Sequence, residues 1–136
     1  MIDSKYKVLY AKALNARDNA YAPYSKFKVG ACVLMKDGTM FDGCNIENAS
    51  FGATNCAERT AIFKAVSNGY EYGDFDKLLV LGDTKGLCYP CAICRQVMSE
   101  FFEKTSEIIV CNIKGDYKVY KFEELLPFAF DKGELD

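Results

Sequence analysis

The sequence predicts an α/β fold, a three-layer α/β/α arrangement in which helices cover both faces of a mixed five-stranded sheet. Two observations support this prediction. A helix and a hairpin at the start of the chain are followed by alternating strands and helices, and the apolar spacing changes between helical and strand periods. Since the chain has 136 residues and half of them are hydrophobic, we expect a single domain over residues 1–136.

The first part of the chain predicts one helix and one hairpin. Residues 4–19 carry apolar side chains at helical spacing, and Ser4 is a candidate N-cap. Residues 27–35 alternate between apolar and other side chains, which is typical of a strand. Residues 36–39 form a predicted hairpin turn, and residues 40–46 form the returning strand.

The rest of the chain alternates between the two periods. Its predicted elements are a helix at 56–67, a strand at 77–81, a helix at 91–103, strands at 107–113 and 117–119, and a short helix at 122–126. Asn68 and Gly69 stop the first of these helices. An opening hairpin followed by this alternation indicates a mixed sheet with helices on both faces.

Charge and hydropathy exclude several classes of partner. The net charge is -2, with 17 basic and 19 acidic residues mixed along the chain, so no basic stripe favours nucleic acid. No apolar run approaches the roughly 20 residues that cross a bilayer, and the N-terminus lacks a secretory pattern. We therefore expect a cytoplasmic protein that binds a small neutral molecule, with no membrane partner.

Cysteine and histidine counts narrow the chemistry. The chain has seven cysteines and no histidine. In a reducing compartment, cysteines serve as ligands, nucleophiles or core residues more often than as disulfides. The absence of histidine excludes Ser-His-Asp and Cys-His catalysis and every histidine-ligated metal site.

The strongest motif pairs two helix starts. Cys56-Ala57-Glu58 opens one predicted helix, and Pro90-Cys91-Ala92-Ile93-Cys94 opens another. Cysteines at i and i+3 share a helix face, so Cys91 and Cys94 can bind one metal. A helix N-terminus favours the ionised thiolates. Pro90 costs little in a first turn, where its missing N–H has no intrahelical partner.

Three thiolates with an open fourth position are typical of catalytic zinc, which lowers the pKa of a bound water to about 7. Glu58 lies two residues from Cys56 and is placed to shuttle protons. Three thiolates on Zn²⁺ leave a net charge of -1, so the site needs positive charge nearby. The helix N-termini supply about half a charge each, and Arg59 or Arg95 could hydrogen-bond the sulfurs.

Simpler interpretations remain open for several residues. Cys88 precedes Cys91 by three positions and could complete a closed four-cysteine structural site, although Glu58 would then be unexplained. Other cysteines fall within predicted strands and are most simply small buried hydrophobes: Cys32, Cys44 and Cys111. By themselves, Phe27 and Phe130 would be core aromatics, and Asn45 and Glu47 would serve a turn after a strand.

A wider set of sequence blocks resembles the small homotetrameric zinc-dependent cytidine deaminases, whose three-cysteine sites carry a glutamate that does not bind the metal. The blocks run in the order of that family from about residue 5 to 130: Tyr24-Ser25-Lys26-Phe27-Lys28-Val29-Gly30-Ala31, Asn45-Ile46-Glu47-Asn48-Ala49, Cys56-Ala57-Glu58-Arg59-Thr60-Ala61, Pro90-Cys91, Cys94-Arg95-Gln96, and Glu124-Leu125-Leu126-Pro127 with Phe130.

The resemblance implies hydrolytic deamination of cytidine and 2′-deoxycytidine to uridine and 2′-deoxyuridine, with release of ammonia, as in pyrimidine salvage. Hydroxide on zinc would attack C4, and Glu58 would shuttle protons. One Zn²⁺ per subunit would be bound by Cys56, Cys91 and Cys94. Arg59 would hydrogen-bond the sulfurs, and Pro90 and Arg95 would support the ligands.

The resemblance also implies a substrate site shared between subunits of a homotetramer. Phe27 would pack on the nucleoside, and Asn45 and Glu47 would bind the ribose hydroxyls. Neighbouring subunits would complete each site, through Ala49, Phe51 and Phe130. The substrate-binding residues implied in this way are Phe27, Asn45, Glu47, Ala49, Phe51, Ala57 and Phe130.

The chain departs from the family pattern at three places. Phe51 replaces a frequent tyrosine, Tyr89 a common serine, and Ala92-Ile93 the usual Gly-Ala. Because none of these is a predicted ligand, we expect altered affinity and retained activity. Rival functions are a blasticidin-type deaminase, a nucleic-acid base editor, which would need a basic surface, and a zinc-stapled scaffold without turnover. The run Asn45-Ile46-Glu47 favours a nucleoside substrate over blasticidin.

Overall fold

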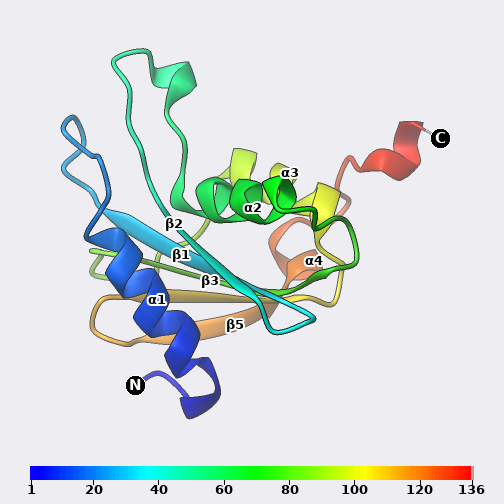
Figure 1. The fold of residues 1–136 in the computed structure, drawn as a ribbon, viewed down its shortest axis with the longest axis horizontal. Helices are drawn as coiled ribbons and strands as arrows, with labels where there is room; N and C mark the ends of the chain where they lie inside the picture. The colour runs from blue at the N-terminus through cyan, green and yellow to red at the C-terminus, as the bar shows by residue number, and fades with distance from the viewer. Residues whose placement is uncertain (136) are drawn as a thin grey trace.

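The structure is a computed structural model that describes residues 1–135. Figure 1 shows five strands that form one sheet between helices. The elements in chain order are η1 (Ser4–Tyr6), α1 (Lys7–Arg17), β1 (Val29–Met35), β2 (Met40–Cys44), η2 (Phe51–Ala53), α2 (Ala57–Ser67), β3 (Phe75–Gly82), α3 (Ala92–Phe101), β4 (Glu107–Asn112), β5 (Tyr117–Lys121), α4 (Phe122–Leu125) and η3 (Lys132–Leu135).

The sheet has the strand order β2-β1-β3-β4-β5. Strands β3 and β4 are parallel, and each of the other neighbouring pairs is antiparallel. A parallel pair needs a crossover connection, and the connection between β3 and β4 contains α3. The predicted mixed five-stranded sheet is therefore confirmed, with the helix between β3 and β4 as the reason for the parallel pair.

The helices form a layer on each face of the sheet, with α1 on one face and α2 and α3 on the other (Figure 1). Alternate residues of one strand reach the two layers. In β4, Ile108 and Val110 are in the core cluster under α2 and α3, whereas Ile109 and Cys111 are in the cluster under α1. Because successive strand side chains point to opposite faces, this alternation gives two cores and confirms the three-layer prediction.

Two glycines allow helices to approach the sheet closely. A Cβ atom on Gly30 in β1 would lie 1.9 Å from the carbonyl oxygen of Ala13 in α1. A Cβ atom on Gly43 in β2 would lie 2.5 Å from the backbone nitrogen of Ala61 in α2. Any larger residue at either position would force a helix away from the sheet.

The helix boundaries differ from the sequence prediction in a way that affects the cysteines. Cys56 and Cys91 are the N-caps of α2 and α3, with extended backbones, and are not members of the helices. Pro90 therefore precedes the cap and does not occupy the first helical turn. Helix α3 ends at Phe101 because Phe102 is extended and its ring packs 5.1 Å from that of Phe75.

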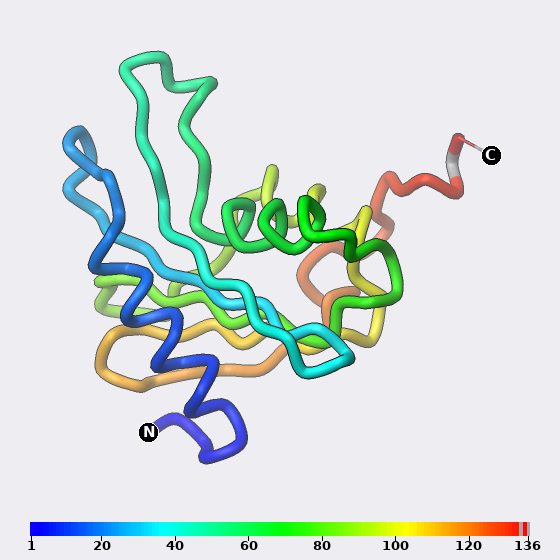
Figure 2. The backbone as a smooth tube through the Cα atoms, in the orientation of Figure 1, coloured from blue at the N-terminus to red at the C-terminus, as the bar shows by residue number. Residues whose placement is uncertain are grey.

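Two segments project from the layered body. The connection from β2 to α2, which contains η2, rises above the sheet, and the C-terminal tail extends away from α4 (Figures 1 and 2). Each of these segments contains a short 3₁₀ turn, η2 in the first and η3 in the second. No helix within residues 1–135 is both long enough and apolar enough to cross a lipid bilayer.

Candidate metal centre and active site

Three cysteine sulfurs meet between the N-termini of α2 and α3. The Sγ atoms of Cys56 and Cys91 are 3.8 Å apart, those of Cys91 and Cys94 are 3.5 Å apart, and the three ligand atoms lie within 4.8 Å of one another. Zinc with Zn–S bonds of about 2.3 Å in tetrahedral geometry requires sulfurs about 3.8 Å apart. The donor type and spacing therefore fit a zinc ion.

The sulfurs lie in an environment that favours negative charge. A hydrogen bond from Cys94 and one from Arg59 lower the pKa of Cys56 to about 5, against the effect of burial. The hydrogen bond with Cys56, together with burial, raises the pKa of the Cys94 thiol. Zinc binds thiolates, so binding of the metal releases any protons that the thiols carry.

Arg59 places its positive charge against this cluster. Its Nη2 atom donates to Cys56 Sγ at 3.3 Å, so the predicted contact with a sulfur is present. Its Nε atom is buried without a hydrogen-bond partner among residues 1–135. A guanidinium beside thiolates offsets the excess negative charge that three sulfurs bring to a divalent metal.

Arg95 does not contact the sulfurs and serves a different purpose. Its Nε donates to the carbonyl oxygen of Pro90 at 2.9 Å, and its Nη1 donates to that of Leu125 at 2.8 Å. The expectation that Arg95 bonds to a sulfur is therefore not met. The reason is the helix period: Arg95 follows Cys94 directly, so its side chain leaves α3 on a different face and ties the residue before Cys91 to α4.

Glu58 is the second residue of α2 and is only 4% exposed. Burial raises the pKa of this carboxyl group to about 7. A nearly neutral pKa allows a carboxyl group to accept and return a proton near physiological pH. Ala57, which lies between Cys56 and Glu58, is fully buried.

Cys88 is close to the cluster but separate from it. Within residues 1–135, the group of sulfurs that lie within 4.8 Å of one another does not include Cys88. A Cβ atom on Gly82 would lie 3.0 Å from its sulfur and 2.9 Å from Phe27 Cζ, so both side chains border Gly82. Burial raises the pKa of the Cys88 thiol to about 12. These observations disfavour the closed four-cysteine site.

The predicted strand cysteines divide into two groups. Cys32 and Cys111 are fully buried, as expected of small hydrophobes, and burial raises the pKa of each to about 12. Cys44, in β2, is only half-buried. All seven cysteines, each within residues 1–135, are free thiols.

Asn45 and Glu47 follow β2 and bind the segment that carries Phe27. Asn45 accepts a hydrogen bond from Val29 N at 2.9 Å and donates to the Phe27 carbonyl oxygen at 2.7 Å. Glu47 Oε1 accepts from the backbone nitrogens of Tyr24 at 2.9 Å and Ser25 at 3.1 Å. Both residues therefore have structural bonds in addition to the predicted role in substrate binding.

Other predicted substrate-binding residues have exposed side chains in the single chain. Phe51, in η2, is 82% exposed, and Phe130, in the tail, is 61% exposed. Ala49 is also exposed. These are the residues for which the resemblance implied a neighbouring subunit, and within one chain they are not part of the sulfur cluster.

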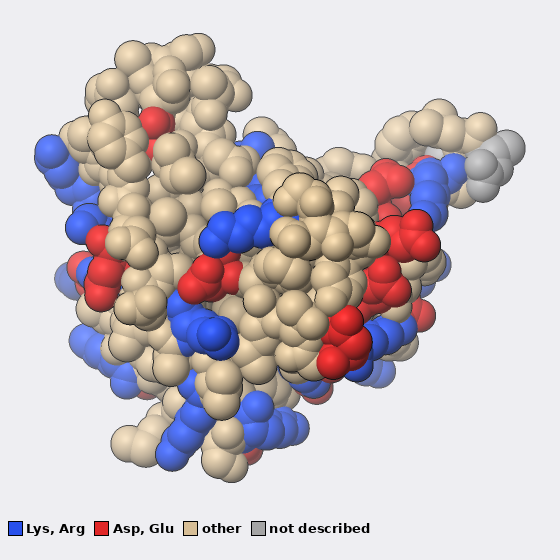
Figure 3. Space-filling model, viewed as in Figure 1, with Lys and Arg blue, Asp and Glu red and all other residues tan. Residues whose placement is uncertain are grey.

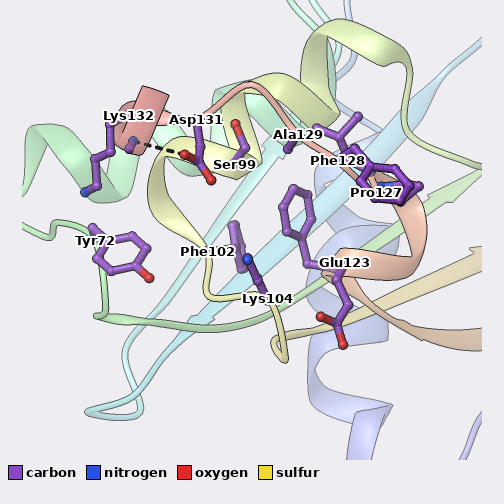
Figure 4. A pocket seen from close by; sticks show the side chains of 13 residues that line it. Tyr72, Ser99, Phe102, Lys104, Glu123, Pro127, Phe128, Ala129, Asp131 and Lys132 are labelled. Carbon is purple, nitrogen blue, oxygen red and sulfur yellow. Dashed lines mark hydrogen bonds between the residues drawn. The ribbon is translucent and has the colours of Figure 1, made fainter. Parts of the chain in front are cut away.

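The C-terminal tail encloses a separate cavity of about 770 Å³ between α3, α4 and the segment before β3. In Figure 4, Phe128 and Pro127 stand on one side of it, and Tyr72 lies opposite, beside Lys132. The Lys132 ammonium is 4.0 Å from the centroid of the Tyr72 ring. The cavity includes none of the three clustered cysteines, so it is not part of the candidate metal centre.

Two residues that hydrogen-bond to predicted substrate-binding residues were not predicted from the sequence. Ser25 donates to Glu47 Oε2 and accepts from Phe27 N at 3.0 Å. Gln96 donates to the Phe130 carbonyl oxygen at 2.6 Å and holds the tail. Both residues fall inside blocks that carry the resemblance. A single serine or glutamine has no spacing that signals such a contact.

Comparisons with known proteins agree with this geometry. The family model described as "Cytidine and deoxycytidylate deaminase zinc-binding region" matches residues 3–111. A cytidine deaminase of Sporosarcina psychrophila is 50% identical over 127 residues, covering 93% of this chain and 92% of its own length. One from Halalkalibacterium halodurans is 47% identical over 130 residues, covering 96% and 97%.

A solved structure gives the same result for the fold. The crystal structure of a cytidine deaminase from Burkholderia pseudomallei superposes with a TM-score of 0.90 at 50% identity, and covers 92% of this chain and 98% of that one. A blasticidin-S deaminase of Bacillus cereus is more distant, at 29% identity over 117 residues, or 80% of this chain and 81% of its own length.

Proposed function

The chain belongs to the cytidine and deoxycytidylate deaminase family and acts as a zinc-dependent cytidine deaminase; on this premise we propose which of its side chains bind the metal, move protons and hold the nucleoside. One observation carries the proposal. Three cysteine sulfurs converge at two helix N-termini, with a buried carboxyl group in the first turn of one of them.

Cys56, Cys91 and Cys94 are the proposed ligands of one zinc ion. Support comes from their mutual distances and from the two helix N-termini, which stabilise negative charge. When bound, zinc supplies a Lewis acid that lowers the pKa of a water molecule to about 7. Arg59 offsets the charge of the thiolates through its bond to Cys56.

Glu58 is the proposed proton carrier. It would take one proton from the attacking water and deliver it to N3 of the cytosine ring, and would then take the proton of the new C4 hydroxyl group and deliver it to the departing amine. Its position two residues from Cys56 and its low exposure support this role, because a buried carboxyl group is shielded from exchange with bulk water.

Phe27, Asn45, Glu47 and Ala57 are the proposed nucleoside-binding residues of the same chain. Phe27 would pack on the base beside Ala57, while Asn45 and Glu47 would hydrogen-bond the sugar hydroxyls. No residue in this set discriminates by its chemistry against a 2′-hydroxyl or its absence. The proposed substrates are therefore cytidine and 2′-deoxycytidine.

We further propose a homotetramer in which Ala49, Phe51 and Phe130 complete the site of a neighbouring subunit. Exposure of Phe51 on the β2–α2 connection and of Phe128 and Phe130 on the C-terminal tail supports this, because aromatic side chains are enriched at protein interfaces. In Figure 3 the projection at the upper left, which Figure 1 shows to contain the β2–α2 connection, carries few charged atoms. Acidic and basic groups are interspersed over the rest of this face. Mixed charge favours neither nucleic acid nor a membrane.

The tetramer has a direct test. Light scattering on the purified protein should give four times the mass of one chain. Mixing Glu58→Gln subunits with Phe51→Ala subunits should restore activity, because some mixed sites combine an intact Glu58 with an intact Phe51 from the neighbour. A monomeric mass, or no gain in activity on mixing, would contradict shared sites.

The seven free cysteines support a reducing, cytoplasmic location. The continuous five-stranded sheet supports a single catalytic domain. Both statements remain part of the proposal. Trapping of free thiols in intact cells with a membrane-permeant alkylating reagent tests the first, because disulfide-bonded protein would resist labelling.

The deaminase assignment is tested by the loss of cytosine absorbance when purified protein meets cytidine. Glu58→Gln should keep its zinc and lower kcat by about 10³-fold, since general acid–base groups contribute 10²- to 10⁴-fold. The control is Glu100→Gln, an exposed carboxylate of α3, which should keep full activity. A Glu58→Gln variant with normal kcat would refute the proton carrier.

Two outcomes would favour rival functions. Bound zinc without turnover of cytidine or 2′-deoxycytidine would indicate a structural zinc scaffold. Faster turnover of blasticidin S than of cytidine would indicate the other deaminase class. The chain is 50% identical to a cytidine deaminase and 29% identical to a blasticidin-S deaminase, which argues against both outcomes.

A further inference from the structure

A short segment before β1, residues 24–28, has a backbone conformation that needs external support. We call it the 24–28 strap. Lys26, at its centre, has φ of 61°, which places a residue other than glycine in the left-handed region. Its backbone nitrogen donates to the Ala22 carbonyl oxygen at 3.1 Å. Such a conformation persists only where surrounding contacts determine it.

The Ser25 hydroxyl joins the strap to Glu47. It donates to Glu47 Oε2 and accepts the hydrogen bond of Phe27 N at 3.0 Å. Glu47 Oε1 accepts from the backbone nitrogens of Tyr24 and Ser25. One carboxylate and one hydroxyl thus accept from the backbone nitrogens of Tyr24, Ser25 and Phe27, on both sides of the left-handed residue. The bonds to the carboxylate are charge-assisted.

The far end of the strap is held by Asn45. Its side chain accepts from Val29 N and donates to the Phe27 carbonyl oxygen. Phe27 is therefore fixed at its nitrogen by Ser25 and at its oxygen by Asn45. Because Asn45 is bonded at both atoms and is only 9% exposed, the remaining freedom of Phe27 is controlled from the Ser25 side.

The ring of Phe27 packs against the end of β3, close to the backbone of Gly82. A Cβ atom on Gly82 would lie 2.9 Å from Phe27 Cζ and 3.0 Å from Cys88 Sγ. The ring and the Cys88 side chain therefore border the same residue, and Cys88 is three residues before Cys91 in the sequence. A change in the strap conformation would move the ring relative to the cysteines.

We propose that Ser25 is a positioning residue, whose hydroxyl couples Glu47 to Phe27 and so holds the sugar-binding and base-binding sides of the site in one relative position. This proposal rests on the proposed function. Glu47, Ser25 and Phe51 also line a cavity of about 460 Å³. Glu47 therefore borders open space while Ser25 holds its carboxylate in place.

The first test is the kinetics of Ser25→Ala with cytidine. Loss of the hydroxyl releases Glu47 Oε2 and Phe27 N together, so KM should rise about fivefold with kcat within about twofold, the effect of losing one net hydrogen bond. Ser25→Thr keeps the hydroxyl and should restore KM. The matched control is Ser67→Ala, whose hydroxyl donates to the Lys64 carbonyl oxygen at 2.8 Å at the far end of α2.

A double-mutant cycle separates positioning from direct contact. If Ser25 acts through Glu47, the KM of Ser25→Ala/Glu47→Ala should be close to that of Glu47→Ala alone, because coupled residues are not additive. Effects that multiply would overturn the proposal, since Ser25 would then act on the substrate independently. An unchanged KM in Ser25→Ala, with only a lower thermal midpoint, would also overturn it.

Binding of uridine, measured by calorimetry, needs no turnover and separates this proposal from the proposed function. Ser25→Ala should weaken uridine binding about fivefold, and Ser25→Thr should not. If the unmodified protein fails to deaminate cytidine but Ser25→Ala still weakens uridine binding, the function fails and the role of Ser25 stands. Equal uridine affinity in Ser25→Ala and the unmodified protein refutes the role of Ser25.

Discussion

The metal half and the nucleoside half of the site are held by different kinds of interaction. In the metal half, Cys56 and Cys91 cap two helices, and Cys94 follows one helical turn later. In the nucleoside half, Asn45 and Glu47 bind the 24–28 strap through side-chain hydrogen bonds that span 16 to 23 residues. Helix geometry therefore positions the first half, and a network of side-chain hydrogen bonds, exposed at Glu47 and buried at Asn45, positions the second.

This difference predicts how substitutions act. A zinc site loses its metal when one ligand is removed, so changes in the metal half should abolish activity. Each hydrogen bond of the nucleoside half contributes modestly, so changes there should alter KM in steps. Substitutions in the metal half and in the nucleoside half test this difference.

Cys94→Ala should remove most of the zinc and reduce kcat to background, because two sulfurs remain where three are needed. Zinc content by elemental analysis and the initial rate with cytidine measure the result. Cys88→Ala is the matched control, since this buried thiol lies outside the sulfur cluster, and it should keep one zinc per chain. Loss of zinc in Cys88→Ala would indicate that Cys88 is a fourth ligand, as in the closed four-cysteine site.

Arg59→Gln should lower kcat about tenfold while zinc is retained, because the bond from Nη2 to Cys56 Sγ then loses its charge. Steady-state kinetics with zinc analysis measure this. Lys64→Gln removes the same charge from the last turn of α2, away from the sulfurs, and should leave kcat unchanged. Equal effects of the two variants would indicate that net charge alone is responsible.

Lys26→Val should raise KM about threefold, because a β-branched residue is strained at positive φ and would shift the strap. Lys26→Gly should leave KM unchanged, since glycine adopts this conformation without strain. Kinetics with cytidine compare the pair. A rise in KM for both variants would show that the Lys26 side chain matters more than the backbone conformation.

The sequence predicted the metal half more completely than the nucleoside half. Spacing alone predicted that Cys91 and Cys94 serve one metal, and their sulfurs lie 3.5 Å apart although Cys91 caps the helix and is not part of it. Arg59, close to Cys56 in the sequence, reaches its sulfur. Sequence proximity did not predict the partners of Arg95, which are the carbonyl oxygens of Pro90 and Leu125. Leu125 lies 30 residues away in the sequence, so no local sequence pattern predicts this hydrogen bond.

Phe51 and Phe130 show a second limit. The resemblance assigned both to substrate binding, yet within one chain both side chains are exposed. A sequence pattern states which residue type occurs at a position and does not state which chain it serves. That part of the assignment stays a prediction until the assembly is measured.

The sequence by itself determined the alternation of elements, the two cysteine-bearing helix starts, the family and the zinc chemistry, because each depends on spacings within one element or on residue types at matched positions. Only the tertiary structure decided the strand order, the bonds of Arg95 and the junction of Ser25, Glu47 and Phe27. Those features join residues that are distant in the chain, and their geometry follows from how the layers pack.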